Sequence, residues 1–145
     1  MRAPLAVVAL LALAPAAACT QPTGASDGAG EAAAPAARGG RVETLDSAEL
    51  AALVEAGKVR LIDVRTPAEF AGGSIAGAIN IPLDRFDPAA IAEEPGRETV
   101  LLCRSDRRSG LAAEQLAAAR GGTVRHLEGG VLAWVEQGLA LTGAD

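Results

Sequence analysis

The alternation of apolar and polar positions predicts a domain in which helices and strands follow one another. Residues 46–49, DSAE, have the composition of a helix N-terminus, and apolar residues at helical spacing follow as far as Gly57. The next stretch, KVRLIDV over 58–64, is apolar and β-branched and predicts a strand. Residues 66–69, TPAE, form a second capping-box pattern with proline at the first helical position, which predicts another helix.

The same alternation continues to the end of the chain. The further expected elements are strands over 78–83, 99–102 and 123–127, a short helix from Asp87-Pro88, and helices over 109–120 and 131–137. Trp134, together with Leu132 and Val135, is expected to anchor the last helix in the core. Strands that alternate with helices favour an α/β fold with a mostly parallel sheet and helices on both faces.

The N-terminal region has a different character. Residues 1–18 combine a basic start with a short apolar run that contains two prolines and ends in small residues, as in a secretory signal peptide. Cys19 follows three alanines, which resembles a bacterial lipoprotein processing box and predicts a lipid anchor; ordinary cleavage after Ala18 is the alternative. Residues 19–41 are small and polar and are expected to form a flexible tether. The predicted location is therefore the cell envelope, or otherwise the periplasm or the medium.

Length and charge narrow the functional classes. A chain of 145 residues is long enough for one domain, assigned here to residues 42–145, and its net charge of −5 argues against nucleic-acid binding. Arg104, Arg107 and Arg108 form a local basic cluster on this acidic domain, which favours a small anionic ligand. One histidine and one cysteine in the domain are too few for a metal ligand set, so neither a metal nor another cofactor is expected.

The candidate chemistry centres on Cys103, which comes directly after the strand predicted over 99–102. Ligands of parallel sheets bind at the carboxyl ends of strands, and Cys103 occupies such a position. The loop amides and the following helix N-terminus, near Ser109, would direct N–H groups toward one point and favour an anion there. A thiolate is stabilised in such surroundings and by nearby arginines, so Cys103 is the expected nucleophile.

Four further patterns occur in a fixed order along the domain. They are DVR over 63–65 with EF over 69–70, GSIAGAINIP over 73–82, CRSDRRS over 103–109, and LEGGVLAW over 127–134. Over about residues 42–142 the chain thereby resembles the single-domain rhodanese family of sulfurtransferases. The resemblance implies a rhodanese-like fold with a central five-stranded sheet.

The resemblance also implies a reaction. Cys103 would take sulfur from a small anionic donor such as thiosulfate, become a persulfide, and pass the sulfur to cyanide, a thiol or a thiol protein. The residues expected to bind the substrate are those of the loop, Arg104, Ser105, Asp106, Arg107 and Arg108. Partners other than these molecules and the membrane are not implied, and the oligomeric state is left open.

Three positions depart from the family pattern. Ser74 stands where histidine is frequent, Ala76 where proline is frequent, and Asp106 where the loop usually has glycine. A glycine there indicates a positive φ, which aspartate tolerates better than most residues, so the loop is expected to form. The carboxylate of Asp106 would, however, repel an anionic donor.

Two other functions remain open. A phosphatase or arsenate reductase of the same fold needs arginine after five intervening residues, and that position is Ser109 here. A tethered persulfide carrier with little turnover is the second alternative. Among the remaining polar residues, His126 is expected to be a strand residue without a catalytic role, and Asp63 with Arg65 to be a structural ion pair.

Overall fold

The computed structural model describes residues 39–143. The predicted signal peptide, Cys19 and all but the last residues of the predicted tether lie outside the described residues. The strands are β1 (Gly40–Leu45), β2 (Val59–Asp63), β3 (Ile79–Asn80), β4 (Glu98–Leu102) and β5 (Gly122–Leu127). The helices are α1 (Ser47–Glu55), α2 (Pro67–Ala71), α3 (Arg107–Arg120) and α4 (Gly130–Glu136), with single 3₁₀ turns at Leu83–Arg85 and Pro88–Ala90.

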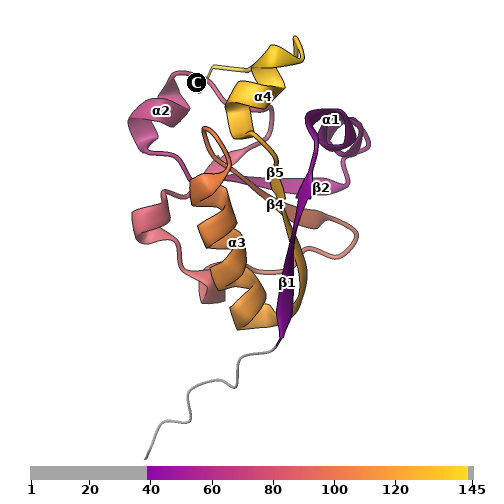
Figure 1. The fold of residues 1–145 in the computed structure, drawn as a ribbon, viewed down its shortest axis with the longest axis vertical. Coiled ribbons are helices and arrows are strands. Elements are labelled where there is room, and N and C mark those ends of the chain that lie inside the picture. Colours follow the sequence, from indigo (N-terminus) through magenta and orange to yellow (C-terminus); the bar gives the residue numbers. More distant parts are fainter. Residues whose placement is uncertain (1–38, 144–145) are drawn as a thin grey trace, which may run out of the picture. The chain divides into compact units, whose positions relative to one another are not determined.

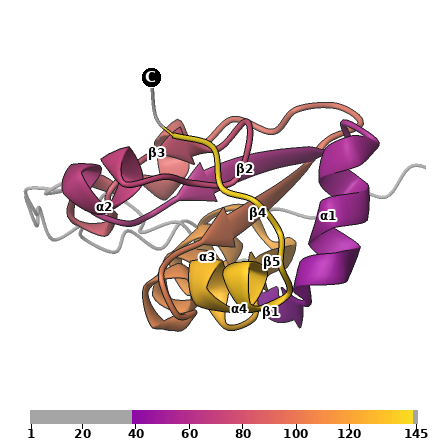
Figure 2. The ribbon, with the colours of Figure 1, turned by 90° about the horizontal axis from the view of Figure 1, so that it is seen from above.

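The five strands form one parallel sheet in the order β1-β5-β4-β2-β3. Helices α3 and α1 lie on opposite sides of this sheet (Figures 1 and 2). One core cluster joins the sheet to α3 and the 3₁₀ turns, and a second joins the opposite face to α1 and α4. The predicted α/β fold with helices on both faces is therefore confirmed, and the sheet is parallel throughout. Among the described residues no helix has the length and hydropathy needed to cross a membrane.

The helix starts follow the predicted capping chemistry. The Asp46 side chain accepts a hydrogen bond from the backbone N–H of Glu49 at 2.8 Å and caps α1. At α2 both halves of the capping box are present, because Thr66 and Glu69 each accept a bond from the backbone of the other. Local sequence thus fixes both helix starts, and the second places Glu69 on the side of the sheet edge where β2 ends.

Some elements differ from the prediction. Strand β1 was not predicted as a strand, and it begins at Gly40, inside the segment assigned to the tether. The strand expected over 78–83 is reduced to β3, because Pro82 has no N–H to continue a ladder and a 3₁₀ turn follows it. Helix α3 begins at Arg107 rather than at Ser109.

The last helix is anchored by fewer residues than expected. Trp134 is 5% exposed and its indole Nε1 donates to the carbonyl oxygen of Ala140 at 3.0 Å, as an anchor should. Leu132 and Val135 are 44% and 50% exposed, so the expectation that they belong to the core is wrong. Only the stripe formed by Val131 and Trp134 faces the sheet, because one helical turn separates these positions.

Candidate active site

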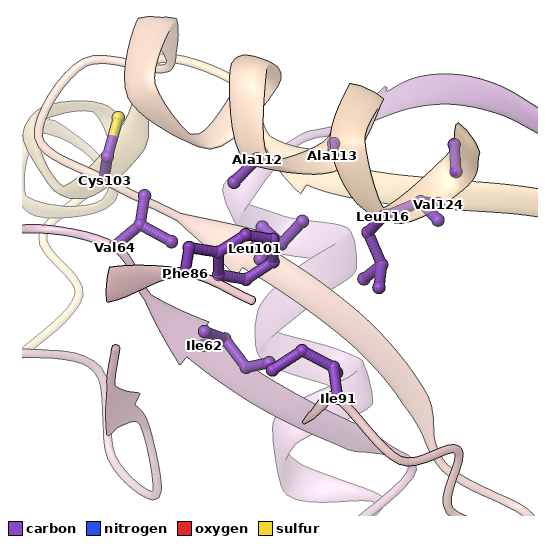
Figure 3. Packing of buried hydrophobic residues seen from close by; sticks show 11 residues of the cluster. Ile62, Val64, Phe86, Ile91, Leu101, Cys103, Ala112, Ala113, Leu116 and Val124 are labelled. Carbon is purple, nitrogen blue, oxygen red and sulfur yellow. The ribbon is translucent and has the colours of Figure 1, made fainter. Parts of the chain in front are cut away.

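Cys103 follows β4 directly, at the carboxyl end of a strand that has neighbours on both sides. Its side chain is 1% exposed and packs in the cluster that contains Val64 and Ala112. Figure 3 shows the sulfur directed away from the core, toward the loop that leads into α3. The thiol thus lies beneath the loop that the sequence singled out.

The N-terminus of α4 holds this loop from below. The backbone N–H of Val131 donates to the carbonyl oxygen of Cys103 at 2.9 Å, and that of Leu132 to Arg104 at 3.1 Å. These bonds need the close approach of Gly130, whose φ is +61° and whose Cβ, if present, would lie 2.5 Å from the Cys103 oxygen. The second glycine of LEGG therefore has a steric purpose, since any side chain there would push the cysteine loop away.

The backbone of Asp106 has the positive φ that the sequence predicted, with φ 84° and ψ −35°. It occupies the N-cap position of α3, but its carboxylate makes no capping bond. Its carbonyl oxygen instead accepts from the Ser109 hydroxyl and from the Gly110 N–H, both at 2.8 Å. The loop therefore turns sharply at Asp106, and the aspartate forms this turn in place of glycine.

The turn leaves a row of backbone N–H groups without protein acceptors. Within the described part of the chain, no hydrogen bond is donated by the backbone N–H groups of residues 104–109. Some of these belong to the first turn of α3, where N–H groups have no partner inside the helix. Such an arrangement is suited to an anion, and the sulfur of Cys103, which points toward this loop in Figure 3, is a candidate for it.

The three loop arginines have different environments. Arg104 and Arg107 are exposed, and within residues 39–143 neither forms a salt bridge. Arg108 is half-buried and binds the carboxylate of Glu69 through two hydrogen bonds of 2.7 and 2.6 Å. Of the three arginines, Arg108 is therefore the one that is fixed, and helix α2 fixes it.

Electrostatics ties this pair to the cysteine. The hydrogen bonds from Arg108 lower the pKa of Glu69 from its ordinary 4.5 to about 2, although burial opposes the change. The pKa of Arg108 is raised, first by its bond to Glu69 and also by the charges of Cys103 and Asp63. Arg108 thus stays cationic, and its charge interacts favourably with a negative Cys103 sulfur.

A groove lies beside the pair, with a volume of about 410 Å³. It is lined by Val64, Thr66, Pro67, Pro82, Leu83, Asp84 and Arg108. The Arg108 guanidinium and the Asp84 carboxylate supply the charges in an otherwise mostly apolar lining. Val64 belongs to the same core cluster as Cys103, and Arg108 directly follows the loop, so the groove adjoins the cysteine loop.

Asp63 and Arg65 form the buried ion pair that was expected. Their side chains are 0% and 7% exposed, and the guanidinium contacts both carboxylate oxygens at 2.7 to 3.0 Å. The Ser74 hydroxyl donates to the same carboxylate at 2.7 Å, so the residue that replaces the frequent histidine joins this network. Asn80 adds bonds to the backbone of Asp63 and Arg65. The network ties the ends of β2 and β3 together.

His126 has a place that the sequence reasoning missed. Its Nδ1 lies 3.3 Å from the Ser109 hydroxyl oxygen, which in turn lies 3.5 Å from the Cys103 sulfur. The signal was present in β5, because His126 and Val124 alternate onto the same face, and Val124 packs in the cluster that contains Cys103. Among the described residues no group of three or more His, Cys, Asp or Glu side chains is placed to hold a metal ion.

The sequence profile of the rhodanese-like domain family matches residues 46–137 of this chain. A sulfurtransferase of Allochromatium vinosum is 37% identical over 106 residues, which are 72% of this chain and 98% of that protein. The human thiosulfate:glutathione sulfurtransferase is 38% identical over 109 residues, 65% of this chain and 94% of that protein.

Two further similarities are to an uncharacterized protein and to a solved rhodanese-related structure. An uncharacterized protein of Synechocystis sp. is 47% identical over 81 residues, 56% of this chain, and the chain spans 45% of its length. Among solved structures, a rhodanese-related protein of Thermoplasma volcanium superposes with a TM-score of 0.61 at 30% identity. That superposition covers 69% of this chain and 97% of the other.

Proposed function

The chain belongs to the rhodanese-like domain family, and from this membership we propose that it transfers sulfane sulfur through a persulfide on Cys103. Two similar proteins are named sulfurtransferases. The observation that carries the proposal is the position of the Cys103 sulfur at the carboxyl end of β4, beneath a row of unpaired backbone N–H groups. That surrounding is suited to a sulfur anion.

The first half-reaction loads the cysteine. The Cys103 thiolate attacks the outer sulfur of a small anionic donor such as thiosulfate, and a new S–S bond forms. The bond between the two sulfur atoms of the donor breaks, and sulfite leaves with the electron pair. The charge is then on the outer sulfur of the persulfide, where preorganised loop amides stabilise it without reorganising.

The second half-reaction returns the enzyme to its starting state. The thiolate of an acceptor, either a small thiol or a thiol protein, attacks the outer sulfur. The persulfide bond breaks, the acceptor leaves as a persulfide, and Cys103 is again a thiolate; cyanide would leave as thiocyanate. Glutathione is a reasonable small acceptor to test, since it appears in the name of the human relative.

The loop arginines have different roles in binding the donor. Arg108 is held by Glu69, so it contributes a fixed positive charge at the groove. Arg104 and Arg107 are exposed and attract anions from solution. The carboxylate of Asp106 at the same loop opposes this attraction, which leaves the choice of thiosulfate as the natural donor to experiment.

The test is the mass of the intact full-length protein after treatment with thiosulfate, and again after addition of cyanide or glutathione. We expect the gain of one sulfur atom, which the acceptor removes, and no gain in the matched control Cys103→Ser. Serine keeps the size of the side chain but cannot form a persulfide. A gain of sulfur in Cys103→Ser, or none in the wild type with any sulfane donor, contradicts the proposal.

A persulfide carrier with little turnover is the second candidate. It is supported by the 1% exposure of Cys103 and by the carboxylate of Asp106, since both slow the approach of an anion. The same mass measurement separates the two functions. An enzyme loses the bound sulfur to a small acceptor, whereas a carrier keeps it until a partner protein is added.

We also propose that the chain is exported and carries a lipid on Cys19. The support is the sequence pattern of residues 1–19, with a basic start, a short apolar run and a cysteine after three alanines. Cys19→Ser should move the protein from the membrane fraction to the soluble fraction, with sulfur transfer unchanged after purification. A wild-type protein that is soluble and begins at an unmodified Cys19 would overturn the anchor.

A further inference from the structure

Three buried polar side chains form a continuous line beneath the cysteine loop. Cys103 is 1%, Ser109 0% and His126 8% exposed. The Ser109 oxygen lies between the other two, 3.5 Å from the cysteine sulfur and 3.3 Å from the histidine Nδ1. These contacts join the end of β4, the first turn of α3 and β5, which follow one another in the sequence.

The single hydrogen of the Ser109 hydroxyl has three acceptors within reach. They are the Asp106 carbonyl oxygen at 2.8 Å, the Cys103 sulfur, and the His126 Nδ1 if that nitrogen has no proton. When Nδ1 carries a proton it donates to the serine oxygen, and the serine hydrogen must point toward the carbonyl or the sulfur. A negative sulfur then attracts that hydrogen, because hydrogen bonds to charged groups are the stronger ones.

The imidazole ring is held where this exchange requires it. It shares the face of β5 with Val124, which packs in the core cluster around Cys103. Its edge lies against the first turn of α3 at Gly110, where a Cβ would sit 3.5 Å from the ring carbon Cε1. The ring is therefore enclosed between sheet and helix, with Nδ1 directed at Ser109.

We propose that His126 is a positioning residue for sulfur transfer: its Nδ1–H holds the Ser109 hydroxyl so that this hydroxyl donates to the Cys103 thiolate and persulfide. The proposal rests on the proposed reaction at Cys103. It gives the histidine a role through serine and without contact to any substrate. It also gives the last serine of CRSDRRS a role besides helix formation.

Burial and the charges around the imidazole ring set the pKa of His126 and thereby the pH at which the Cys103–Ser109–His126 contacts change. Burial lowers the pKa of His126, while the carboxylates of Asp106, Glu114 and Glu128 act in the opposite direction. These groups come from the loop, from α3 and from the turn after β5. Because burial is the largest cause, the ring is neutral at neutral pH, and the form with hydrogen on Nδ1 is the one that serves Ser109.

The test titrates the thiolate by its ultraviolet absorbance against pH in the full-length protein, with Cys103→Ser subtracted as background. His126→Leu and Ser109→Ala each remove the line, and each should raise the titration midpoint by roughly one pH unit, a tenfold loss of thiolate. His126→Asn keeps a donor near the position of Nδ1 and should restore most of the shift. Glu114→Gln removes only a nearby charge and serves as the matched control, with a smaller shift.

The double variant decides between positioning and structure. If the line acts as one unit, Ser109→Ala with His126→Leu has the same midpoint as either single variant. The proposal would be overturned by any of three results: the midpoint shifts of the two single variants add in the double variant, His126→Leu leaves the midpoint unchanged, or His126→Asn fails to restore it. The absorbance needs no sulfur donor, so this result stands apart from the mass test. If the wild type gains no sulfur in the mass test but the variants shift the thiolate titration midpoint, the proposed reaction is refuted and the positioning role of His126 is retained.

Discussion

Replacing Asp106 by glycine should make the domain more stable and faster with thiosulfate. Asp106 is half-buried in the loop at φ 84° and ψ −35°. An L-residue with a left-handed backbone costs ~1–2 kcal/mol, less for aspartate than for most residues. Glycine removes this strain but adds ~0.4–1 kcal/mol of entropy to the unfolded chain. The net gain should be about 0.5 kcal/mol, which raises the melting temperature by roughly 2–4 °C.

Kinetics should show the second effect. Removing the carboxylate lowers repulsion of an anionic donor by ~1 kcal/mol or less, which corresponds to at most about a fivefold rise in kcat/KM. Salt should reduce this rise, because at 0.1 M the screening length is ~10 Å.

Two further variants separate strain from charge. Asp106→Asn keeps a residue that tolerates positive φ but removes the charge, so it should match glycine in kinetics and the wild type in stability. Asp106→Ala also removes the charge but should be the least stable of the set. Thermal unfolding and thiosulfate kinetics at two salt concentrations measure both effects. If glycine is no more stable than alanine, or if asparagine is as slow as the wild type, the reasoning is refuted.

Other outcomes follow from the fixed contacts. Glu69→Gln should lower the free energy of unfolding by about 0.5–1 kcal/mol at neutral pH. The pKa of Glu69 is about 2 in the folded protein and 4.5 ordinarily. The difference between variant and wild type, measured by urea unfolding, should therefore disappear as the pH falls from 4.5 to 2. A cost that persists below pH 2 would point to packing instead. Gly130→Ala should destabilise by more than about 2 kcal/mol, and Gly57→Ala, also at positive φ but in open space, by about 1; equal costs in denaturation would mean that the loop gives way. Asp63→Asn should cost about 3–5 kcal/mol, and an unchanged unfolding midpoint would contradict a buried ion pair.

Local signals predicted the fold and the position of Cys103 at the end of a strand. The capping box at Thr66 and Glu69 and the apolar strand before Cys103 depend on neighbours in the sequence, so a single sequence suffices to find them. The positive φ of Asp106 was also predicted, because the position of glycine in the resembling family carries conformational information. Such features need no knowledge of which elements meet in space.

The missed features all depend on tertiary contacts. Half of the residues of strand β1 are polar and it is largely exposed at the sheet edge, so it has little apolar pattern to detect. Of the three loop arginines, only Arg108 is fixed by a salt bridge in residues 39–143, because α2 places Glu69 beside it. The link from His126 to Cys103 needs the strand order, which places β5 beside β4. Sequence reasoning named these residues but could not say which of them meet.

The pairing of β1 with β5 has a consequence for how the domain forms. Of the strands in residues 39–143, the first lies at the sheet edge and has the last as its neighbour, with Gly40 opposite Gly122. Pairing strands so far apart in the sequence is slow, because the chain loses entropy when the loop closes, before the new contacts stabilise the fold. The cysteine loop reaches its final conformation still later, because the carbonyl groups of Cys103 and Arg104 accept hydrogen bonds from Val131 and Leu132 of α4. The residue with the most reactive chemistry therefore acquires its surroundings only when almost the whole domain has folded.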